Sequence, residues 1–184
     1  MNLSYQTVSP EEAAESGAKV VITTRDEAGL VKRIDSVMLD TELQKYPAVA
    51  KAKILKNIAG SPIDDRLVVG VDPGNRIGIS VIYLNEEIHS FVESSPIDAT
   101  EEICRLIGGI GSSRTIVRIG DGNISMARYI GRMIKSRFGN GTIVEIVNEH
   151  GTSRPTNTDT NRRGLRDKSS ARNIAFRSGR ALAD

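Results

Sequence analysis

The second half of the chain alternates between short apolar runs and segments whose apolar residues recur at helical spacing. β-branched residues dominate the short runs, which predicts strands, while the helical segments begin at capping residues or end at glycines. The predicted strands are about 67–72, 76–83, 87–93, 114–119 and 142–147. Three helices are also predicted: the first begins at the Asp98–Glu101 capping box, and the others cover about 124–138 and 165–182. The order βββαβαβα predicts an α/β fold with a mixed five-stranded sheet flanked by helices.

Residues 1–65 follow a less regular pattern, which predicts a small N-terminal α+β unit separate from a domain at 66–184. Its expected elements are a strand at 3–8, a helix after the Ser9–Glu12 capping box, a strand at 19–23, a helix from the Thr24–Glu27 capping box to Met38, and a helix ending at Ala59. We find no catalytic constellation in this unit. We therefore expect it to act as a cap, an oligomer contact or a partner-binding surface.

Composition narrows the classes of site that the chain can hold. Of the 184 residues, 39% are hydrophobic and 26% are charged, as in ordinary globular proteins. No long apolar stretch or signal peptide is recognisable, so we expect a cytoplasmic protein without a membrane segment. One cysteine, Cys104, and two histidines, His89 and His150, make a cysteine- or histidine-rich metal site improbable. Any bound metal should therefore have oxygen ligands, which favours Mg²⁺ or Mn²⁺.

The first predicted strand of the larger domain ends in Asp72, followed by a Pro-Gly turn. An aspartate at the end of a buried strand has a firmly held backbone and an open edge, which suits metal binding. It also suits a plain turn cap. Which interpretation holds depends on whether other acids reach the same edge.

Two further acids do follow predicted strands. Asp121 comes after the fourth strand and Glu149 after the fifth, and parallel strands place their carboxyl ends at one edge of a sheet. Each of them could instead be a turn residue or a helix cap. Asp167, near the start of the last helix, would join them if that helix packs near the first strand. Otherwise Asp167 is an acid that stabilises the helix dipole.

A cluster of four carboxylates needs a counterion. Like charges held close together repel and raise one another's pKa, so folding alone disfavours such an arrangement. Divalent cations relieve the repulsion, and two of them about 4 Å apart can promote hydrolysis of a phosphodiester. The pattern Asp72, Asp121, Glu149 and Asp167 therefore predicts a metal site for phosphoryl chemistry.

The C-terminal segment is basic although the net charge of the whole chain is only +2. From Arg154 onward there are eight basic and three acidic residues. Such asymmetry indicates binding to phosphate groups, and the alternative is a solvated helix face. The residues that we expect to contact nucleic acid are Arg154, Arg162, Arg163, Arg166, Lys168 and Arg172.

Several motifs carry a resemblance to a known superfamily. They are Val-Gly-Val-Asp-Pro-Gly around Asp72 with Gly78 on the next strand, Asn148-Glu149-His150-Gly151-Thr152-Ser153 after the fifth strand, and Asp167 with Ser169, Ser170 and Ala171 on the last helix. Together with the order βββαβαβα, they make residues 66–184 resemble the ribonuclease H-like superfamily. Within it, the chain is most similar to the RuvC-type Holliday-junction resolvases and their YqgF relatives, which act in DNA recombination and repair.

This resemblance implies a metal-dependent endonuclease acting on branched DNA or structured RNA. Asp72 would bridge two Mg²⁺ or Mn²⁺ ions, Glu149 and Asp167 would complete the site, and Asp121 would be a fourth ligand. The resemblance also allows a homodimer.

Two other interpretations remain open. Actin-like ATPases share the superfamily fold and use a glycine-rich hairpin after the equivalent aspartate. Here Asn75 and Arg76 stand where those proteins carry a hydroxyl pair. The other interpretation is a non-catalytic nucleic-acid-binding or assembly module that keeps the fold.

Overall fold

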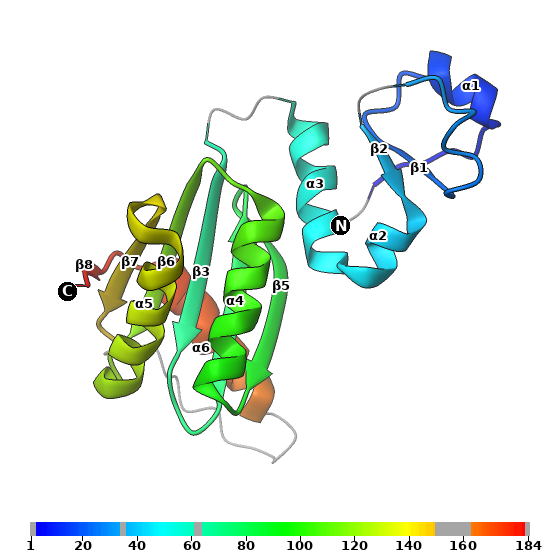
Figure 1. Cartoon of the computed structure of the whole chain (residues 1–184). Coiled ribbons are helices and arrows are strands. Elements are labelled where there is room, and N and C mark those ends of the chain that lie inside the picture. Colours follow the sequence, from blue (N-terminus) through cyan, green and yellow to red (C-terminus); the bar gives the residue numbers. More distant parts are fainter. Residues whose placement is uncertain (1–2, 34–35, 61–63, 150–162, 183–184) are drawn as a thin grey trace. The chain divides into compact units, whose positions relative to one another are not determined.

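The computed structural model describes residues 3–33, 36–60, 64–149 and 163–182. The chain forms two compact units, Met1–Pro62 and Ile63–Asp184, and each is described by itself (Figure 1). The boundary between them falls three residues before the predicted one at 65/66. Across the described residues, no helix combines the length and the apolar character needed to cross a membrane.

The N-terminal unit has a two-stranded parallel sheet and three helices. Its elements are α1 (Pro10–Glu15), β1 (Val21–Thr23), β2 (Val37–Leu39), α2 (Asp40–Lys45) and α3 (Pro47–Ala59). The small core consists of Met38, Ala50 and Ile54. The capping box that starts α1 is present as predicted: Ser9 and Glu12 each bond the other's backbone N–H.

Two predictions for the N-terminal unit are wrong. Residues 3–8 form no strand, and the segment expected to be a helix from Thr24 to Met38 forms turns and then β2. The Glu27 N–H donates to the Thr24 hydroxyl, which is one half of a capping box, and the Thr24 hydroxyl donates to the Glu27 carboxylate, but turns follow and not an α-helix. Ser36 has a positive φ of 61°, which ends any helix, and residues 37–39 pair with β1 instead.

The second unit contains a mixed six-stranded sheet with helices on both faces. The strands are β3 (Arg66–Asp72), β4 (Ile77–Tyr83), β5 (Glu86–Glu93), β6 (Arg114–Gly120), β7 (Thr142–Val147) and β8 (Arg180–Ala181), in the order β5-β4-β3-β6-β7-β8. As predicted, β3, β6 and β7 are parallel. The hairpin strands β4 and β5 are antiparallel. The unit is thus an α/β fold whose elements follow the predicted order βββαβαβα, with a sixth strand, β8, after the last helix.

Helices α4 (Pro96–Ile110) and α5 (Ile124–Phe138) cover one face of this sheet, and α6 (Arg163–Ala175) covers the other (Figure 1). A short 3₁₀ helix, η1 (Gly139–Gly141), joins α5 to β7. Helix α4 begins at Pro96, two residues before the predicted capping box, because its N-cap is Ser95 and not Asp98. Val69, Val71 and Ile79 are completely buried in the sheet, and burial of each contributes about 1.5 to 3 kcal/mol.

The sixth strand, β8, was not predicted, and the last helix is shorter than the expected 165–182. Helix α6 ends at Ala175, where Arg177 N–H donates to Ile174 O at 3.1 Å in a tight closing turn. The chain then reverses, and β8 pairs antiparallel with β7. Leu182 is buried, and its N–H donates to Val144 O at 2.9 Å. A strand of two residues leaves no periodic pattern, which is why the sequence did not reveal it.

Candidate functional site

Asp72 is the last residue of β3, a strand that lies between β4 and β6. It pairs with Gly78 on β4, and its side chain is partly buried on the side covered by α6. The hydroxyl of Ser170 on α6 donates a hydrogen bond to the Asp72 carboxylate. Asp72 therefore lies between the sheet edge and the last helix.

Two glycines allow α6 to lie directly on the sheet. A Cβ at Gly70 of β3 would overlap the backbone oxygen of Ala171, and a Cβ at Gly78 of β4 would overlap that of Asp167. Any larger residue would hold the helix away from the strands. This close approach is what brings Asp167 and Ser170 of α6 to Asp72.

Glu149 reaches the same edge from two residues beyond β7. A Cβ at Gly120 or Gly122 would overlap its carboxylate, so these glycines form the space that the carboxylate occupies. The Gly122 N–H donates a hydrogen bond to that carboxylate. The Glu149 N–H donates to Oδ1 of Asp121 at 3.0 Å, and Asp121 N–H donates to Val147 O at 3.0 Å. These bonds hold the segments after β6 and β7 together.

The electrostatics of the carboxylates reflect their proximity. Burial, followed by the negative charges of Glu149 and Asp167, raises the pKa of Asp72 to about 6, while the Ser170 hydrogen bond lowers it. Burial also raises the pKa of Glu149 above its ordinary value; the Gly122 hydrogen bond opposes this and the charge of Asp121 adds to it. Two acids with raised pKa values at one sheet edge mark a candidate functional site.

One cation of the chain already lies beside these acids. Arg76, in the turn between β3 and β4, places its Nε 3.5 Å from Oδ2 of Asp167. The Arg76 side chain is 51% exposed and that of Asp167 is 22% exposed. An ion pair this open to water contributes about 0 to 1 kcal/mol to stability, so the guanidinium can exchange partners at small cost.

Of the four predicted site residues, the structure therefore brings Glu149 and Asp167 close enough to Asp72 for their charges to raise its pKa. Asp121 is exposed and contacts the backbone of Glu149. Its described interactions are thus with Glu149 and not with Asp72.

The predicted basic residues divide into two groups. Arg166 and Arg172 are exposed on α6 and Lys168 is partly exposed there, and Arg172 lies over the ring of Phe176 at 5.9 Å. Arg163 begins α6, but its side chain is outside the described set. Arg154, Arg162 and the segment from His150 to Ser153 also lie outside the described residues.

The donor set at Asp72 is chemically suited to a hard divalent cation. It consists of carboxylates, which Mg²⁺ and Mn²⁺ prefer, and a cation would relieve the charge that raises the pKa of Asp72. Within residues 3–33, 36–60, 64–149 and 163–182, however, no three acidic, histidine or cysteine side chains form a ready-made metal-binding group. Side chains of Asp72, Glu149 and Asp167 would have to move to hold an ion together.

Sequence reasoning missed the supporting residues of this site. It assigned no role to Ser170, to Arg76, or to Gly120 and Gly122. The glycines within or directly after β-branched strands were the available signal, because glycine in such a place often marks close approach by another group. Ser170 was named only as part of the motif around Asp167, and Arg76 had no signal beyond its proximity in sequence to Asp72.

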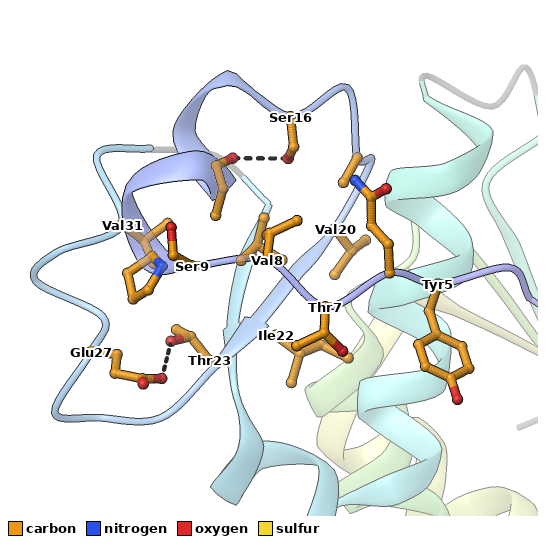
Figure 2. Close-up of a pocket in the computed structure, with 15 residues that line it drawn as sticks. Tyr5, Thr7, Val8, Ser9, Ser16, Val20, Ile22, Thr23, Glu27 and Val31 are labelled. Carbon is orange, nitrogen blue, oxygen red and sulfur yellow. Dashed lines mark hydrogen bonds between the residues drawn. The ribbon is translucent and has the colours of Figure 1, made fainter.

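The N-terminal unit holds a separate pocket of about 360 Å³ (Figure 2). It is lined by the segment from Tyr5 to Pro10, by α1 and by β1. Glu27 is the only carboxylate in its lining, and it accepts a hydrogen bond from Thr23 at 3.4 Å (Figure 2). Apolar and hydroxyl side chains otherwise surround the space. Such a lining lacks the paired acids, bases or nucleophiles that catalysis requires.

No protein-family model matches the chain, and no curated protein sequence matches it. Function is therefore inferred from the fold and the site.

Proposed function

We propose that the second unit is a ribonuclease H-like domain of the RuvC and YqgF type, and that the protein is a divalent-metal-dependent endonuclease for structured nucleic acid. Branched DNA, such as a Holliday junction, and structured RNA are the proposed substrates. The observation that carries the proposal is the convergence on Asp72: the carboxylates of Glu149 and Asp167 act on it from β7 and α6.

The sheet supports this proposal. Three hairpin-connected strands are followed by two parallel strands that each come after a helix, and a last helix covers the opposite face. In such a sheet the carboxyl ends of β3, β6 and β7 share one edge, where ligands of α/β proteins bind. Asp72, Asp121 and Glu149 occupy those three strand ends.

Asp72, Glu149 and Asp167 would hold Mg²⁺ or Mn²⁺, with Asp121 next to Glu149. The metal would supply charge stabilisation and an activated water for phosphodiester hydrolysis. The residues of the chain contribute the rest. Ser170 orients the Asp72 carboxylate, the glycines admit α6 and Glu149, and Arg166, Lys168 and Arg172 supply positive charge along α6 for the phosphate backbone.

A non-catalytic nucleic-acid-binding module is the second candidate, and two observations favour it. The described residues contain no ready-made metal-binding group, and Arg76 already neutralises part of the charge of Asp167. A module of this kind would use the same basic residues and would need no divalent ion.

The decisive experiment combines metal titration with cleavage. Isothermal calorimetry with Mn²⁺ and incubation with four-way DNA junctions, flapped duplexes and structured RNA should be run on the wild type, on Asp72→Asn and on Asp26→Asn. Asp26 is an exposed aspartate of the N-terminal unit, so its variant removes one carboxylate that is not among the proposed site residues. The proposal expects Mn²⁺ binding and cleavage in the wild type and Asp26→Asn, and loss of both in Asp72→Asn.

Cleavage retained by Asp72→Asn would contradict the assignment of the catalytic site to Asp72 and its neighbours. Binding of nucleic acid without Mn²⁺ binding or cleavage in the wild type would establish the non-catalytic module instead.

A further inference from the structure

Helix α5 carries an unusual concentration of positive charge. Its 15 residues include four basic side chains and no acidic one; the basic residues are Arg128, Arg132, Lys135 and Arg137. The neighbouring helix α4, on the same face of the sheet, carries three acids and one arginine. The charge of α5 is therefore a property of this helix and not of the whole face.

The outward side of α5 forms a single stripe over a shallow hollow. The stripe, which we call the α5 stripe, consists of Ser125, Arg128, Tyr129, Arg132, Met133 and Ser136. These residues recur every three or four positions, so they share one side of the helix. The opposite side, with Ala127, Ile130 and Ile134, is buried against the sheet. Tyr129 and Met133 are each 42% exposed.

Folding alone gives no reason for this arrangement. Arg128 and Arg132 are four residues apart on one helix, and like charges at that spacing repel and destabilise the helix. Neither arginine forms an ion pair or a side-chain hydrogen bond with any residue that the structure describes. A polyanionic partner would relieve the repulsion.

We propose that the α5 stripe binds the sugar-phosphate backbone of a nucleic acid, as a contact surface separate from the basic residues of α6. This inference rests on the proposed function, because the nucleic acid is the one held at Asp72. Helix α5 begins three residues after Asp121, at the sheet edge of the candidate site. With 15 residues it extends about 22 Å from that edge, which corresponds to roughly six phosphates along one strand.

The chemistry of the stripe favours a phosphate backbone over an acidic protein. Arginine, serine and tyrosine side chains are those that commonly donate hydrogen bonds to phosphate oxygens. Ser125 and Ser136 lie at the two ends of the stripe, and Tyr129 lies between the two arginines. Because α5 and α6 cover opposite faces of the sheet, the stripe contacts a backbone segment different from the one that α6 contacts (Figure 1).

The test measures binding of the full chain to a four-way DNA junction by fluorescence anisotropy in Ca²⁺, at salt concentrations from 50 to 200 mM. The variant is Arg128→Gln/Arg132→Gln, and the control is Arg25→Gln/Lys32→Gln, which removes the same charge from exposed positions of the N-terminal unit. Losing two phosphate contacts should make the negative slope of log K against log salt less steep by about 1.8. The wild type and the control should then lose about tenfold more affinity over this range than the variant loses.

The double variant also removes the repulsion between Arg128 and Arg132, so we expect it to fold. Circular dichroism checks that it does. A slope and affinity equal to those of the control would overturn the α5 proposal and leave the proposed function intact. Salt-dependent binding that is lost in the variant, in a wild type that cuts nothing in Mn²⁺, would support the α5 stripe while the nuclease proposal fails. No binding by the wild type even at 50 mM salt would count against both.

Discussion

Asp72 makes the folded state sensitive to pH. Its carboxyl group has an ordinary pKa of 3.8, and the folded chain raises this pKa to about 6. Between these values the folded chain binds more protons than the unfolded chain, so stability falls as the pH rises from about 4 to about 6. Above pH 6 the loss of stability caused by the ionised Asp72 carboxylate is constant, and below pH 3.8 this loss vanishes. At neutral pH the ionised Asp72 carboxylate therefore lowers the free energy of unfolding of the protein.

Replacing Asp72 with asparagine should remove that penalty. We expect Asp72→Asn to raise the free energy of unfolding at pH 7.5 by about 1 to 3 kcal/mol, because a pKa shift of one unit corresponds to about 1.4 kcal/mol. At pH 3.5 the variant and the wild type should be equally stable. Urea unfolding followed by circular dichroism at several pH values measures this difference.

Asp26→Asn is the control for this experiment and should change the stability little at any pH. A variant Asp72→Asn that is less stable than the wild type at pH 7.5 would show that the carboxylate is held by favourable contacts, contrary to the raised pKa.

At the scale of elements, the position of α6 decides whether the site exists. Its C-terminal end is fixed to the sheet by Arg118 of β6, whose Nη1 donates to Ala175 O at 2.7 Å and whose Nε donates to Glu145 at 2.8 Å. Nearer its start, Gly78 lets the backbone at Asp167 lie against β4. The helix is therefore fixed at its C-terminal end by a hydrogen bond from Arg118, and near its start the absence of a side chain at Gly78 lets it lie against β4.

A single methyl group at Gly78 should push this helix away. We expect Gly78→Ala to lower the free energy of unfolding by about 1 to 3 kcal/mol, because the added Cβ overlaps backbone atoms that cannot rotate aside. It should also weaken Mn²⁺ binding, since Asp167 and Ser170 move away from Asp72. Urea unfolding and calorimetry measure the two effects.

Gly108→Ala provides a matched control for the change at Gly78. Gly108 lies on α4, and a Cβ there meets nothing within 4 Å. In a helix alanine is favoured over glycine, so this variant should gain about 0.5 to 1 kcal/mol and bind Mn²⁺ like the wild type. Equal stabilities of the two variants would contradict the close approach of α6.

The elements of the second unit could be predicted because each produces a strong local signal. β-branched runs marked β3 and β7, and apolar spacing marked α4 and α5. Contacts between distant segments had no such signal. The sequence did not show that α6 lies directly on Gly70 and Gly78, that it stops at Ala175, or that two residues after it form β8. The acids could be named from strand ends, whereas their supporting residues depended on packing.

At the scale of the whole molecule, Asp65 shows where the second unit begins. Its carboxylate accepts a hydrogen bond from the Tyr83 hydroxyl at 2.6 Å and one from the Ser113 N–H at 3.2 Å. Its backbone oxygen accepts from Arg114 N–H at 3.1 Å. Tyr83 is completely buried, and burial, followed by the hydrogen bond to Asp65 and the charge of Asp65, raises the pKa of its hydroxyl. Asp65 therefore belongs with the sheet, although the sequence pattern placed it at the end of the N-terminal unit.

This anchor can be tested with two adjacent aspartates. In the full chain, Asp65→Ala should lower the free energy of unfolding by about 1 to 3 kcal/mol, because it leaves the buried Tyr83 hydroxyl without its acceptor. Asp64→Ala should cost less than about 1 kcal/mol, because the interaction described for the Asp64 side chain is an exposed ion pair with Arg66 at 3.1 Å. Urea unfolding of both variants gives the comparison.

Shortened chains extend the same reasoning to the boundary. A chain of residues 63–184 keeps Asp65 and should unfold cooperatively, whereas a chain of residues 66–184 should be less stable by an amount similar to that lost in Asp65→Ala. If Tyr83→Phe is introduced, the hydroxyl that needs Asp65 is gone, and the two shortened chains should differ by less. A difference between them that Tyr83→Phe leaves unchanged would mean that the hydrogen bonds of Asp65 with Ser113 and Arg114, and not the buried hydroxyl, set the start of the unit.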